Sequence, residues 1–125
     1  MRRPSEGRLI AEERWARADE APRLSREVPQ LRQLKLTLSE WRGPLEISGT
    51  AHSRLFVIDT APAVFVIPCG DSRCRDGGHD LTYQIMHALA ARQQHFEGED
   101  ECRGTLGGNS CDRTLHYVLT AIYED

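Results

Sequence analysis

The amino-acid sequence predicts an α+β fold: a small antiparallel sheet of three to five strands, with one main helix packed on a face and a helix near the N-terminus. Short apolar runs rich in β-branched residues occur at 55–67, apolar residues recur at helical spacing over 81–94, and 115–123 is apolar on both faces. A chain of 125 residues is enough for one core. We therefore expect an N-terminal helical arm at 1–28 and a single domain at 29–125.

The N-terminal helix is predicted over residues 5–21, a segment rich in Glu, Ala and Arg. Ser5 can cap this helix, and Ala11 and Trp15 share one face of it. A helix of this length is marginal alone, so we expect it to dock on the core of the domain or on a partner.

Residues 34–40 predict a strand, because apolar and polar side chains alternate there at period two. A helix is the competing interpretation, because the segment is poor in β-branched residues and a helical period also fits Leu31, Leu34, Leu38 and Trp41.

Residues 55–58 and 63–67 predict a β-hairpin. Both runs are short, apolar and β-branched, and the sequence Asp-Thr-Ala-Pro at 59–62 suits the turn. The second strand runs directly into Pro68 and Cys69, so a cysteine is expected at a strand end.

The main helix is predicted over residues 81–94, with Asp80 as its N-cap. Its inner face is formed by Leu81, Ile85, Ala88 and Leu89. An acidic, glycine-rich loop is expected next. Residues 115–123 then predict a strand in the middle of the sheet, because they are apolar on both faces.

The four cysteines form two close pairs, Cys69 with Cys74 and Cys102 with Cys111. Thiolates are soft donors, and four of them satisfy tetrahedral zinc completely. Glycine, aspartate and asparagine residues in both loops allow the sharp turns that point two sulfurs inward. The sequence therefore predicts one structural Zn²⁺ per chain, bound by these four cysteines at one end of the sheet.

Other interpretations of the cysteines are free buried thiols, disulfides or a reactive thiol. His79 is the alternative ligand near the first pair. Four arginines within two residues of a cysteine could donate to the sulfurs, as could backbone N–H groups, or they could be solvated; they are Arg73, Arg75, Arg103 and Arg113.

The cysteine arrangement resembles zinc-ribbon-like modules in one general respect, two cysteine pairs at the ends of strands. It differs from them in both spacings, and in the helix that separates the pairs. The resemblance therefore implies a metal-binding module and no particular activity.

The composition points to a cytoplasmic protein. No apolar run approaches the roughly 18 residues that cross a bilayer, and the N-terminal residues lack the apolar core of a secretory signal. Persistent disulfides are rare in the cytoplasm, which further favours a metal site.

We expect no enzymatic activity. The sequence has no glycine-rich phosphate loop, no His-Glu-x-x-His, no Gly-x-Ser-x-Gly and no Cys-x-x-Cys. A catalytic zinc also needs an open position for water, and four cysteine ligands leave none.

Three functions remain. A protein-interaction or adaptor module, working with a protein partner or as a homo-oligomer, ranks first. A nucleic-acid-binding zinc module ranks second, because residues 69–125 carry a net charge of −5 that repels phosphates. A thiol-based redox sensor ranks third, because it requires an exposed, activated thiolate.

Overall fold

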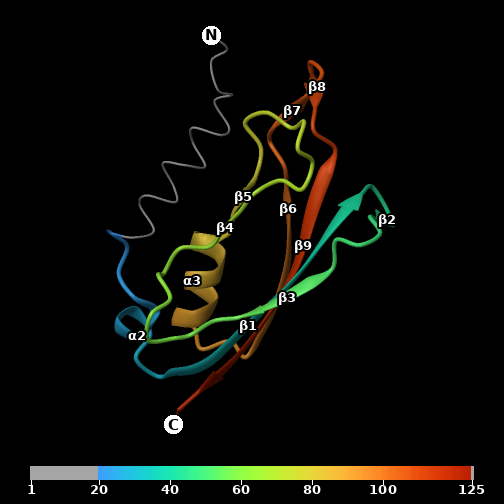
Figure 1. Ribbon diagram of the computed structural model, residues 1–125. Coiled ribbons are helices and arrows are strands. Elements are labelled where there is room, and N and C mark those ends of the chain that lie inside the picture. Colours follow the sequence, from blue (N-terminus) through green and yellow to red (C-terminus); the bar gives the residue numbers. More distant parts are fainter. Residues whose placement is uncertain (1–19, 125) are drawn as a thin grey trace.

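A five-stranded antiparallel sheet forms the body of the protein (Figure 1). The computed structural model describes residues 20–124. The strands follow the order β2–β1–β9–β6, and β3 pairs with the same edge of β1 as β2 does. They are β1 (Leu31–Arg42), β2 (Leu45–Glu46), β3 (His52–Leu55), β6 (His95–Glu101) and β9 (Arg113–Tyr123). The predicted antiparallel sheet is confirmed.

The structure resolves the ambiguity at residues 34–40 in favour of a strand. Leu34, Leu36 and Leu38 are fully buried, and Leu36 pairs with Leu119 of β9. Residues two apart lie on the same face of a strand but about 200° apart around a helix. Only the strand therefore brings all three leucines to one core.

Strand β9 lies in the middle of the sheet, as predicted, between β1 and β6. Only one of its faces is fully buried, the face that carries Leu115, Tyr117, Leu119 and Ala121. The other face includes Ile122, which is 56% exposed, so the strand is central in the sheet without being enclosed on both faces.

The predicted hairpin between 55–58 and 63–67 is wrong. After β3, the N–H groups of Thr60 and Ala61 both donate to the Val57 carbonyl in a helical turn. In the following residues alternate side chains are buried, but the backbone bonds to two other segments: Ala63 N–H donates to Pro22 and Leu24 N–H to Ala61 in one, and Leu81 N–H donates to Phe65 in the other. The apolar pattern did not identify the partners of this segment.

The predicted acidic loop after the helix is also wrong, because residues 95–101 form strand β6. Phe96, Gly98 and Asp100 are half-buried and alternate with exposed neighbours, which is the pattern of a strand with one covered face. A Cβ at Gly98 would collide with the Tyr117 ring on β9, so a larger residue there would have to displace that ring.

The described helices are short. Helix α2 spans Leu24–Glu27, and α3 spans Thr82–Ala90 instead of the predicted 81–94. Helix α3 ends early because Arg92 takes a positive φ of 54° and Gln93 N–H bonds to Ala88 C=O, which is a Schellman motif. No described helix is long and apolar enough to cross a membrane.

One hydrophobic cluster includes buried residues from β1, β9, α2 and α3. Leu24 of α2 is fully buried in it, as are Ile85 and Leu89 of α3. The predicted helix at 5–21 lies outside the described residues, and the division into an arm at 1–28 and a domain at 29–125 stays a prediction.

Candidate metal centre

The structure brings all four predicted cysteines together. Their sulfur atoms lie within 4.8 Å of one another, and Cys102 and Cys111 are buried. The Sγ atoms of Cys69 and Cys111 are 3.9 Å apart, and those of Cys74 and Cys102 are 3.6 Å apart. Zn–S bonds of about 2.3 Å in a tetrahedron place sulfurs about 3.8 Å apart, so these four atoms fit around one ion.

The second cysteine pair flanks a tight hairpin. Strands β7 (Thr105–Leu106) and β8 (Asn109–Ser110) pair across Gly107 and Gly108, whose φ angles of 55° and 87° suit a type I′ turn. Cys111 N–H donates to Gly104 C=O at 2.7 Å, and Cys102 N–H donates to Arg113 C=O at 2.9 Å. The hairpin therefore holds the backbone of both cysteines.

The first cysteine pair begins where β4 (Val66–Ile67) ends. Cys74 N–H donates to Asp71 C=O at 3.0 Å, which closes a turn between the two ligands. The buried Asp71 carboxylate accepts bonds from the side chain and backbone N–H of Arg73, and these bonds lower the pKa of Asp71 to about 2. The Asp71 carboxylate therefore stays ionised at neutral pH, and its bonds to Arg73 stabilise this loop.

Backbone bonds join the two loops directly. Arg75 N–H donates to Thr105 C=O at 2.9 Å, and Thr105 N–H donates back to Arg75 C=O at 2.8 Å. Because one residue belongs to each loop, this bridge brings the two cysteine pairs face to face.

Two glycines provide the space for the sulfurs. A Cβ at Gly77 would collide with the sulfurs of Cys74 and Cys102, and a Cβ at Gly104 would collide with the sulfur of Cys74. The neighbouring Gly78 donates its N–H to Cys102 Sγ at 3.4 Å. The sequence predicted glycine turns here, but the need for bare backbone beside the sulfurs emerges only from the structure.

Glu40, which no motif in the sequence marks, anchors the first loop to the sheet. Its carboxylate accepts a bond from Gly70 N–H at 2.9 Å and pairs with the Arg113 guanidinium at 3.2 Å. The Glu40 and Arg113 side chains are only 15% and 13% exposed. The position of Glu40 in an alternating strand gives no sign of this role, which depends on the path of a distant loop.

The thiols are poorly suited to ionise together. Burial raises the pKa of Cys69 to about 12 and also raises that of Cys74. Burial opposes ionisation of Cys102 as well, but hydrogen bonds from the N–H groups of Gly104 and Gly78 outweigh it and lower that pKa. A divalent cation would stabilise all four thiolates, and its binding must displace protons, so affinity falls as pH falls.

His79, the predicted alternative ligand, lies outside the sulfur cluster. It belongs to β5 (His79–Asp80), which pairs with β4, and its side chain is completely buried. Its Nδ1 lies 2.7 Å from Asp100 Oδ2 on β6. A carboxylate only accepts, so Nδ1 carries the proton. The Nε2 atom is buried and has no hydrogen-bond partner among residues 20–124.

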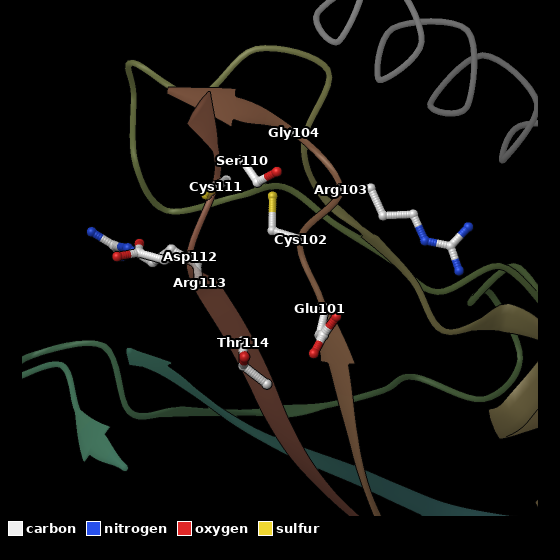
Figure 2. Close-up of a pocket in the computed structure, with 9 residues that line it drawn as sticks. All are labelled: Glu101, Cys102, Arg103, Gly104, Ser110, Cys111, Asp112, Arg113 and Thr114. Carbon is white, nitrogen blue, oxygen red and sulfur yellow. The ribbon is translucent and has the colours of Figure 1, made fainter. Parts of the chain in front are cut away.

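The four arginines near the cysteines are predicted either to donate to the sulfurs or to be solvated, and two of them form ion pairs with carboxylates. Arg73 pairs with Asp71, and Arg113 pairs with Glu40. A pocket of about 370 Å³ lies beside Cys102 and Cys111. Figure 2 shows the residues that line it, with the Arg103 side chain directed away from the sulfurs. Backbone N–H groups, the other predicted donors, are the groups that bond to Cys102.

Comparison of the chain with protein-family models, with curated proteins and with solved structures gives no match. The interpretation of the four-cysteine cluster therefore depends on its geometry alone. That geometry describes a small protein with a site able to bind a metal ion.

The bond between His79 and Asp100 leads to a prediction about metal affinity. It ties the segment after the first cysteine pair to the strand that enters Cys102, so Asp100→Ala should let the two halves of the site separate. We expect the dissociation constant for zinc, measured by competition with a chelator, to rise about 10-fold, the lower end of the effects of indirect metal-site partners.

The matched control is Glu99→Ala, which removes the pair between Glu99 of β6 and His116 of β9 (3.4 Å) on the more exposed face of β6. Glu99→Ala should leave zinc affinity unchanged. If Asp100→Ala lowers the melting temperature but not the zinc affinity, the bond between His79 and Asp100 stabilises the core and does not contribute to metal binding.

Proposed function

We propose that Cys69, Cys74, Cys102 and Cys111 bind one Zn²⁺ per chain as a structural ion, and that the domain it stabilises is a protein-interaction or adaptor module. The observation that carries the zinc proposal is the convergence of four sulfurs within 4.8 Å. Four thiolates select zinc or iron over harder metals, and zinc needs no redox partner.

The closed ligand set supports a non-catalytic role. Four cysteine thiolates fill a tetrahedral zinc site, so no position remains for an activated water. Reduced thiols are also needed for binding, which supports a location in the cytoplasm, where thiols stay reduced. The zinc-ribbon-like character of the site lies in its paired ligands at strand ends.

Exposed apolar side chains support a protein partner or a homo-oligomer. In the described part of the chain, five large apolar or aromatic side chains are more than half exposed: Leu45, Leu55, Val57, Tyr83 and Ile122. The net charge of −5 over residues 69–125 weighs against nucleic acid as the partner.

Elemental analysis tests the zinc proposal. Protein purified without added metal should contain close to one zinc per chain. Replacement by Co²⁺ should give the intense visible and near-ultraviolet absorption of a four-thiolate site, and Cys74→Ser should weaken it by changing one donor. Iron in place of zinc would correct the identity of the metal, whereas metal-free protein with four reduced thiols would reject the site.

A further inference from the structure

The closest sulfur contacts run between the two loops. Cys69 contacts Cys111 at 3.9 Å, and Cys74 contacts Cys102 at 3.6 Å. Each contact joins one half-exposed cysteine of the first loop to one buried cysteine of the hairpin. Both of these sulfur contacts therefore cross the site from one loop to the other.

The hairpin register disfavours a disulfide between Cys102 and Cys111. The backbone bonds place Cys102 opposite Arg113 and Cys111 opposite Gly104, so the two cysteines are diagonal neighbours. Diagonal positions in an antiparallel pair are about 7–8 Å apart, beyond the usual Cα separation of a disulfide. A set of disulfides that joins the cysteines within each loop would include Cys102–Cys111, so it would require the hairpin to rearrange.

We propose, building on the proposed zinc binding, that the site is redox-regulated: hydrogen peroxide exchanges the metal for two disulfides, Cys69–Cys111 and Cys74–Cys102. The half-exposed thiolate of the first loop attacks the terminal peroxide oxygen, forms a sulfenic acid and releases the other oxygen as water after protonation. The buried partner thiolate then attacks that sulfur, forms the S–S bond and releases a second water after protonation.

Each disulfide thus transfers two electrons from two sulfurs to one peroxide, and the zinc leaves as Zn²⁺ without changing its oxidation state. Both disulfides join the same two loops that the metal joins. The oxidised protein therefore keeps its loops together, while a site with a net charge of −2, from four thiolates and one Zn²⁺, becomes neutral.

Peptide mapping tests the pairing, because trypsin should cut after Arg73, Arg75, Arg103 and Arg113 and release each cysteine on its own peptide. Zinc-loaded protein would be titrated with hydrogen peroxide, zinc release followed with a chromophoric chelator, and the alkylated digest analysed without reduction. We expect two peroxides consumed per zinc released, peptide 55–73 linked to 104–113, and peptide 74–75 linked to 93–103.

Dithiothreitol and zinc should restore the starting protein, and the oxidised form should melt higher than the reduced, metal-free form. In the Cys74→Ser variant, the link between Cys69 and Cys111 should still form while Cys102 stays alkylatable. Either of the other two connectivities, or zinc release with sulfinic acids and no disulfides, overturns the exchange and leaves zinc binding intact. Absence of zinc before oxidation overturns the proposed function itself.

Discussion

Removal of the metal is expected to lower the melting temperature by about 15 °C or more, or to abolish cooperative unfolding. Structural zinc contributes roughly 10 kcal/mol or more in small domains, comparable with the whole stability of a protein this size. A loss of about 3 kcal/mol already shifts the melting temperature by some 15 °C. A bound ion would take the place of a hydrophobic core here: over residues 68–78 and 102–112, the buried residues are Asp71, Cys102, Gly104 and Cys111.

Cys102→Ser should produce the same loss, measured by calorimetry or circular dichroism on zinc-loaded protein. The metal-free background is the control. There the substitution should change the melting temperature little, because serine and cysteine differ mainly in their ability to bind zinc. An equal loss with and without metal would assign the effect to packing of the Cys102 side chain, and an unchanged melting curve would show that the sheet is stable without the ion.

The ligands were predictable from sequence, whereas their supports were not. Soft donors in close pairs, with glycines between them, are a local signal that one loop can show by itself. Glu40 bonds to Gly70, which lies 30 residues away in the sequence. Asp100 bonds to His79, which lies 21 residues away. No periodicity in a single segment records such a contact.

The same distinction holds for the fold. Alternating leucines predicted β1, and the apolar run 115–123 predicted the central strand β9. The hairpin failed because residues 61–67 find partners in segments around Pro22 and Leu81, which pattern alone does not select. Strand β6 was not predicted, because its acidic side chains indicated a loop. The period of two in this strand is set by Phe96, Gly98 and Asp100.

Gly104→Ala is expected to weaken zinc binding about 100-fold, the upper end of the range for supports of a metal site. The added methyl group would collide with the Cys74 sulfur and would lie 2.5 Å from the Arg75 carbonyl oxygen and 2.7 Å from Gly77 Cα. These backbone atoms cannot shift freely, because the bonds between Arg75 and Thr105 hold the two loops together. Overpacking of this kind typically destabilises a fold by about 1–3 kcal/mol.

Gly107→Asn is the matched control in the same hairpin. Gly107 has no atom within 4 Å of its added Cβ, and asparagine tolerates its positive φ of 55°. We expect Gly107→Asn to retain full zinc affinity in chelator competition and the four-thiolate Co²⁺ spectrum, whereas Gly104→Ala should lose affinity and distort the spectrum. Since Gly104 has no positive φ, its effect would come from lost space alone. Equal zinc affinities in the two variants would mean that the loops can move apart without opening the site. The glycines would then be needed for the turns and not for the space around the sulfurs.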